Sequence, residues 1–112
     1  MNKLITSLLL ALSMNACVTN SSTINLDNAD PEADALAALE KRDFRFMALT
    51  LRGTVIPGVD PTKMRQYELK CGVKFMPNVT DAIRDKEQLK ALQKSRDYAA
   101  KYNSVIIERC IP

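Results

Sequence analysis

The sequence predicts a small α/β domain over residues 30–112, in which helices and strands alternate in the order α-β-α-β-α-β. Three observations indicate this class. Helix-start signals recur along the chain, short apolar runs separate the helical segments, and 112 residues suffice for one small domain. Strands that alternate with helices of this length are typical of βαβ units, so we expect a three-stranded sheet packed by helices.

The first half of the domain opens with a helix and a strand. Asp30 can act as an N-cap with Pro31 at the first helical position, so we expect a helix that continues to Arg42. The run FRFMALTL, residues 44–51, is short and apolar, which predicts a strand buried on both faces. The glycine- and proline-containing stretch 52–60 is then expected to be a loop.

The second half repeats this pattern. An aspartate–proline pair opens a helix expected over 61–70, and a short strand follows over 73–76. The longest helix is expected over 85–102, with Asn103 closing it. The run SVIIERC, residues 104–110, predicts the last strand. The first two strands should lie parallel, because a right-handed crossover joins them.

The composition limits the chemistry that the chain can perform. The net charge of +3 comes from 16 Lys plus Arg and 13 Asp plus Glu, and these charges are interspersed. Proteins that bind nucleic acids concentrate their basic residues in a patch, so we expect no nucleic-acid partner. The chain has no histidine, which removes the commonest general base and metal ligand. We therefore expect no catalytic residues, no metal and no cofactor. The sequence does not decide whether the protein is an enzyme, but it favours a protein without enzymatic activity.

Residues 1–16 have the order of a secretory signal peptide. One positive charge at Lys3 precedes an apolar stretch of eleven residues, 4–14, and small residues follow. A membrane-spanning helix needs about 20 apolar residues, so this stretch is too short to span a bilayer. A buried N-terminal helix is the alternative interpretation.

The end of this segment reads Met14-Asn15-Ala16-Cys17 and resembles the lipobox of bacterial lipoproteins. That pattern is usually Leu, a small residue, Gly or Ala, and an invariant Cys. Ala16 and Cys17 match it, Met14 replaces leucine, and Asn15 departs from the small residue. The resemblance implies cleavage before Cys17 and attachment of lipid, including palmitate, at this residue. Two or more acyl chains would hold the protein stably on a membrane.

The residue after the cysteine bears on where the protein is held. In the family that the chain resembles, an aspartate there favours the inner membrane, and its replacement by Val18 implies the outer membrane, facing the periplasm. Cleavage after Ser13 by an ordinary signal peptidase would instead give a soluble periplasmic or secreted product. The polar segment 17–29, rich in Ser, Thr and Asn, predicts a flexible tether between lipid and domain.

If Cys17 carries lipid, Cys71 and Cys110 remain as an even pair in an oxidising compartment, so we expect a disulfide between them. Parallel second and third strands would place these cysteines at opposite ends of the sheet, beyond the reach of a disulfide. The pairing therefore favours an antiparallel last strand and a mixed sheet. Two reduced thiols or an intermolecular bond are the alternatives.

A ligand site is the second functional hypothesis. Loops that follow two parallel strands lie at the same edge of a sheet, where open α/β sheets bind ligands. The speculative ligand residues in loops 52–60 and 77–84 are Arg52, Gly53, Thr54, Asn78, Thr80 and Asp81. The leading hypothesis is a lipid-anchored, non-enzymatic interaction module with a protein partner. The alternative is a small ligand-binding or catalytic domain that uses these loops.

Overall fold

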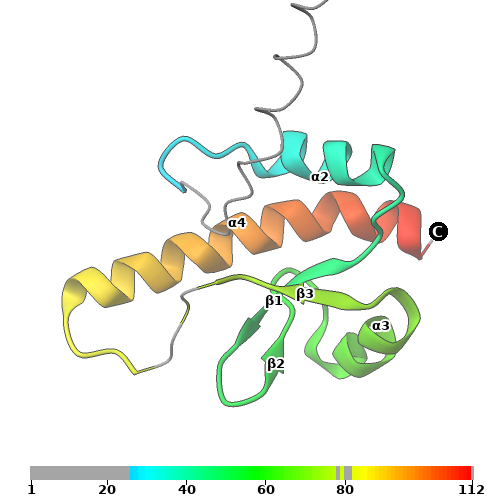
Figure 1. The fold of residues 1–112 in the computed structure, drawn as a ribbon. Helices are drawn as coiled ribbons and strands as arrows, with labels where there is room; N and C mark the ends of the chain where they lie inside the picture. The colour runs from blue at the N-terminus through cyan, green and yellow to red at the C-terminus, as the bar shows by residue number, and fades with distance from the viewer. Residues whose placement is uncertain (1–25, 78, 80–81, 112) are drawn as a thin grey trace, which may run out of the picture.

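A computed structural model describes residues 26–77, 79 and 82–111 (Figure 1). The described chain is an α/β domain with a three-stranded mixed sheet. Its elements are α2 (Pro31–Glu40), β1 (Phe46–Thr50), β2 (Thr54–Val55), the 3-10 turn η3 (Pro61–Lys63), α3 (Met64–Cys71), β3 (Val73–Phe75) and α4 (Lys86–Cys110). Cys17 and the predicted signal lie outside the described residues.

The sheet has the strand order β2-β1-β3, with β1 in the centre. β1 pairs in parallel with β3, and Phe46 faces Val73 in the register. β1 pairs antiparallel with β2, and Leu49 faces Val55. The predicted parallel pairing of the runs 44–51 and 73–76 is therefore confirmed, as is the mixed character of the sheet.

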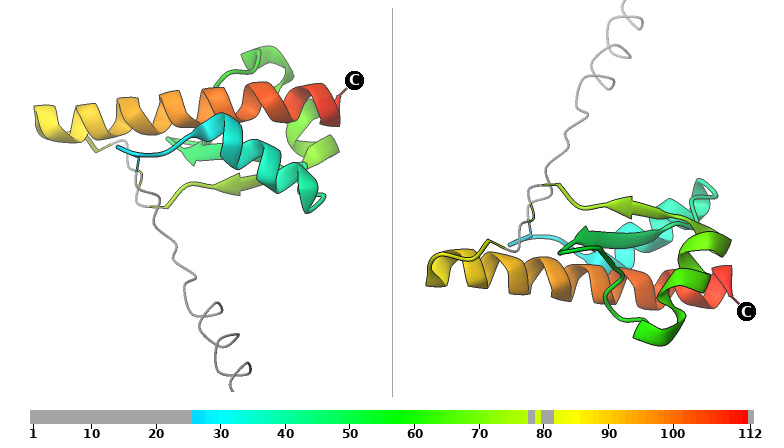
Figure 2. Two further views of the ribbon diagram at one scale, coloured as in Figure 1. Left: turned by 90° about the horizontal axis from the view of Figure 1, so that it is seen from above. Right: turned by 90° about the horizontal axis from the view of Figure 1, so that it is seen from below.

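Helices cover the central strand from more than one side. α2 and α4 lie beside each other and α4 packs on β1, as the views from above and below make clear (Figure 2). α3 reaches β1 through the rings of Tyr67 and Phe46, whose centroids lie 5.8 Å apart. The first four residues of β1 are buried, which agrees with the expectation of a strand covered on both faces.

Aspartates begin α2, the 3-10 turn η3 and α4, and the starts at Asp30 and Asp60 agree with the sequence prediction. The segment predicted as one helix over 61–70 begins as η3 and continues as α3 from Met64. Asp30, Asp60 and Asp85 each accept a hydrogen bond from a backbone N–H two or three residues further on, at 3.1, 3.0 and 2.8 Å. These bonds satisfy donors that have no partner within the helix. Gly72 ends α3 with a positive φ of 81°.

The predicted last strand, 104–110, is wrong, because this segment continues α4 to Cys110. The buried residues of α4 recur at three- and four-residue intervals across the expected boundary: Ser95, Tyr98, Ala99, Tyr102, Asn103 and Ile106. The β-branched run favoured a strand locally, but packing of this stripe on β1 overrides that preference. The third strand of the sheet is instead Thr54–Val55, inside the segment expected to be a loop.

Asn103 does not close the helix but is completely buried within it. Its amide accepts from the N–H of Met47 at 2.7 Å and donates to the carbonyl oxygen of the same residue at 2.9 Å. It also donates to the carbonyl oxygen of Pro57 at 2.8 Å. The side chain thus takes the place of a neighbouring strand where β2 is too short to pair with β1.

The described chain starts in contact with the domain. Leu26 and Ala29 are partly buried against the core, and Asp27 pairs with Lys94 of α4 at 2.6 Å. Within the described ranges, no helix combines the length and apolar character needed to cross a membrane.

Candidate functional site

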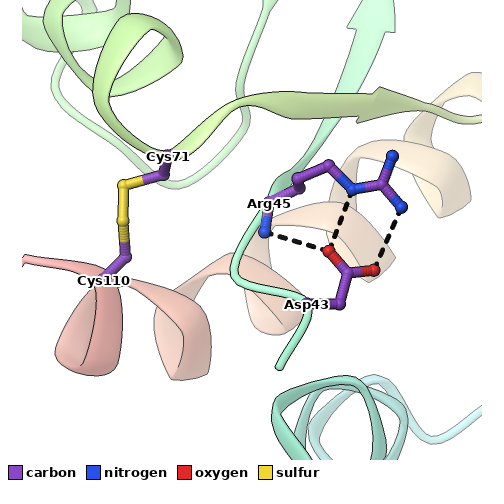
Figure 3. The surroundings of a disulfide bond; sticks show 4 residues. All are labelled: Asp43, Arg45, Cys71 and Cys110. Atoms are coloured by element: carbon purple, nitrogen blue, oxygen red, sulfur yellow. Dashed lines mark hydrogen bonds and ion pairs between the residues drawn. A yellow bond between two sulfur atoms is a disulfide. The ribbon is translucent and has the colours of Figure 1, made fainter. Parts of the chain in front are cut away.

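A disulfide joins Cys71, the last residue of α3, to Cys110, the last residue of α4 (Figure 3). Their α-carbons lie 6.3 Å apart. The two cysteines meet because α4 runs back along the sheet and ends beside the end of α3. The pairing predicted from the sequence is present, but a helix rather than an antiparallel strand brings Cys110 to it.

A hollow of about 480 Å³ lies beside this disulfide. Its walls come from the segment after α2 and from the last turns of α3 and α4. We call it the basic hollow, and its lining residues are Arg42, Asp43, Phe44, Arg45, Lys70, Cys71, Arg109 and Cys110. Four cationic side chains thus face a single carboxylate.

The carboxylate of Asp43 is fully engaged within the domain. Arg45 donates to it through Nε at 2.9 Å and Nη2 at 3.2 Å, a fork-like pair drawn in Figure 3. Lys74 donates to the other side of the group at 2.9 Å. The hydrogen bonds from Arg45, together with those from Lys74, hold the pKa of Asp43 well below its usual range, although burial opposes this shift.

The other three cations of the basic hollow are unpaired. The side chains of Arg42, Lys70 and Arg109 make no ion pair or hydrogen bond within the part of the chain that the structure describes. All three residues are exposed to solvent. Their ammonium and guanidinium groups therefore remain available to an external anion.

Arg42 occupies a backbone position that favours glycine. The N–H of Asp43 bonds to the carbonyl of Ala38, and that of Arg42 bonds to the carbonyl of Leu39, both at 2.9 Å. These two bonds form the Schellman motif that ends α2, in which the residue at Arg42 is left-handed, with φ of 61°. A side chain with a Cβ is strained there, and the chain nevertheless places an arginine beside the hollow.

Helix ends reduce the positive potential of the hollow without cancelling it. α2, α3 and α4 all end near it, and each C-terminus carries a partial charge of about −0.5. The side chains contribute a formal excess of three positive charges, since four cations face one carboxylate. The helix ends offset about half of this excess, so the hollow stays positive.

A second hollow of about 370 Å³ lies on the other side of Asp43. We call it the Tyr102 hollow, and it is lined by Asp34, Ala37, Ala38, Lys41, Asp43, Met47, Lys74, Tyr98 and Tyr102. The hydroxyl of Tyr98 donates to Asp34 at 2.6 Å, and Lys74 lies 4.9 Å from the centre of the Tyr102 ring. Burial, followed by the hydrogen bond to Asp34, raises the pKa of Tyr98 far above its ordinary value. Asp34, Asp43 and Lys74 thus have partners within the domain, and Lys41 is the remaining charged residue of this hollow.

The ligand residues suggested by the sequence fall in two groups. Arg52 and Gly53 lie in the turn between β1 and β2 and both have positive φ, and Thr54 is the first residue of β2. A turn of this kind accounts for the glycine without a ligand. Asn78, Thr80 and Asp81 lie outside the described residues, so the expected meeting of the two loops stays a prediction.

Close packing explains why a glycine stands at position 58, which also lies in the segment 52–60. A Cβ at this position would lie 3.0 Å from the carbonyl oxygen of Ala100, and the φ of Gly58 is +86°. The loop therefore packs closely on α4 through its backbone at this point.

The sequence reasoning missed Arg42, Lys70 and Arg109. A signal for two of them was present, because Lys70 directly precedes Cys71 and Arg109 directly precedes Cys110. The expected disulfide by itself brings these two cations together. Arg42 could be added only after the end of α2 was located beside them.

The described segments of the chain contain no group of three or more His, Cys, Asp or Glu residues arranged to hold a metal ion. Comparison of the chain with models of known families, with curated proteins and with solved structures finds no match.

Proposed function

We propose that this protein is a lipid-anchored, non-enzymatic interaction module that is held at the outer membrane through Cys17, faces the periplasm, and binds a protein partner with the basic hollow. The observation that carries the proposal is the group of three unpaired cations, Arg42, Lys70 and Arg109, around one hollow. Like charges gathered in this way repel one another, and an anionic partner relieves the repulsion.

The position of the hollow supports this arrangement. The described chain starts near Lys94, since its residue Asp27 pairs with that lysine. Arg109 lies fifteen residues further along α4, a distance of about 22 Å at 1.5 Å per residue. A domain tethered from its N-terminal side thus keeps the hollow clear of the attachment point.

Crosslinking in living cells tests the interaction. A photo-crosslinking amino acid in place of Glu108, which is exposed next to Arg109, should give one dominant adduct with a partner. The same amino acid in place of Lys90, exposed in the first half of α4, is the matched control and should not give this adduct. Failure of position 108 to give an adduct, or equal adducts at both positions, would contradict the proposal.

The anchor is tested separately. Radiolabelled palmitate should enter the wild-type protein but not the Cys17→Ser variant, and the variant should leave the membrane fraction. Equal labelling of the two proteins would show that Cys17 is not the lipid site.

A further inference from the structure

We infer that the basic hollow binds an acidic segment of the partner protein, whose carboxylates pair with Arg42 and Arg109. This inference rests on the proposed function, since it names the chemistry of the partner that the module binds. Guanidinium groups present a planar pair of donors that matches the two oxygens of a carboxylate.

The hollow already contains an example of this recognition. Arg45 binds both oxygens of Asp43 with one nitrogen each, at 2.9 and 3.2 Å. That pair shows that a carboxylate fits beside the disulfide when a guanidinium faces it. Arg42 and Arg109 line the same hollow and lack such a carboxylate among the described residues.

Apolar surface around the hollow favours a peptide over a small anion. Phe44 and the disulfide form part of its lining. Apolar side chains that flank acidic residues in a peptide can cover these groups, whereas free phosphate or a lipid headgroup leaves them in water.

Peptide binding by the purified protein tests the inference. The chain from residue 17 onward with Cys17→Ser keeps every residue of the described fold and removes lipid insertion as a cause of binding. The probe is a fluorescein-labelled peptide of alternating glutamate and leucine, measured by anisotropy at low salt. We expect saturable binding that weakens as salt is added, and no comparable binding of the same peptide with glutamine in place of glutamate.

Variants assign the binding to the hollow. Arg109→Gln and Arg42→Gly should each weaken binding about tenfold, because each removes a charge-assisted pair. Arg65→Gln removes an exposed cation of α3 that does not line the hollow, and it should leave the affinity unchanged. The Arg42→Gly variant should fold, since glycine suits the backbone at this position, so weaker binding by it cannot be ascribed to misfolding.

Defined outcomes overturn the inference. Equal affinity in wild type, Arg42→Gly and Arg109→Gln would do so, as would equal binding of the glutamine peptide. Binding of inorganic phosphate or of phosphatidylcholine–phosphatidylglycerol vesicles through these arginines, without binding of the acidic peptide, would assign the hollow to phosphate instead. If the crosslinked adduct at position 108 persists in an Arg42→Gly, Arg109→Gln double variant, the proposed function stands and this inference fails.

Discussion

The basic hollow and the Tyr102 hollow share Asp43 as a wall, but they use their charges differently. In the Tyr102 hollow, Asp43 is bound by Lys74 and Asp34 is bound by Tyr98. In the basic hollow, three cations have no anionic partner within the described chain. Charges that have a partner within the domain can stabilise the fold, whereas the three cations of the basic hollow are available for binding. Four variants test whether paired and unpaired charges differ in this way.

Loss of the disulfide, which lines the basic hollow, should have the largest effect on the free energy of unfolding. The Cys71→Ser, Cys110→Ser double variant removes a crosslink between residues 39 apart in sequence, worth about 4 kcal/mol of unfolding free energy in the chain-entropy model. Urea denaturation of the variant and of the wild type measures the loss. Reductant should lower the wild type to the level of the variant and leave the variant unchanged; a wild type that is insensitive to reductant would contradict the prediction.

Asn103→Ala should have the next largest effect on the free energy of unfolding. Asn103 bonds to the backbone of Met47, which lines the Tyr102 hollow. The substitution leaves the N–H and C=O of Met47 and the C=O of Pro57 without this partner in or near the core. We expect a loss of about 3 kcal/mol in the free energy of unfolding. Ser104→Ala is the matched control, since the neighbouring hydroxyl is exposed and bonds only to the carbonyl of Lys101. Similar losses in the two variants would mean that the Asn103 bonds do not stabilise the fold.

Asp43→Asn tests the wall that both hollows share. It removes the charge that Arg45 and Lys74 bind, and we expect a loss of about 1–2 kcal/mol at neutral pH. Because the folded protein lowers the pKa of Asp43, its carboxylate stabilises the fold above the ordinary value of 3.8, and this contribution disappears as pH falls below that value. Urea denaturation at neutral pH and near pH 3 should show a shallower acid dependence in Asp43→Asn than in the wild type. Parallel pH profiles would argue against this role.

Arg42→Gly should have the smallest effect, and its sign is opposite. Removal of the Cβ at a φ of 61° relieves strain and should stabilise the fold by about 1 kcal/mol. Arg42→Ala is the control, since it removes the same charge but keeps the strain. If the thermal midpoint rises in Arg42→Gly and not in Arg42→Ala, the arginine is retained at a cost to stability, as expected of a binding residue. Equal midpoints would remove this argument for the basic hollow.

Much of the fold could be predicted from short stretches of sequence. The helix starts at Asp30 and Asp60 and the buried run of β1 depend on neighbours in the chain, and each lies where the sequence predicts it. The path beyond Asn103 could not be predicted in this way, because Val105, Ile106 and Ile107 fit a strand as well as a helix until they pack on a surface. β2 has only two residues, Thr54 and Val55, and becomes a strand because β1 lies beside it.

The candidate site likewise contains residues that could be predicted from the sequence and one that could not. Cys71 and Cys110 can be recognised in the sequence as an even pair if Cys17 carries lipid, and a lysine and an arginine directly precede them. The position of Arg42 beside these cations could not be predicted, because the ends of α2, α3 and α4 meet through contacts between residues far apart in the chain. Caps and turns are local interactions that a short segment encodes, whereas the charge of a hollow depends on which distant segments pack around it.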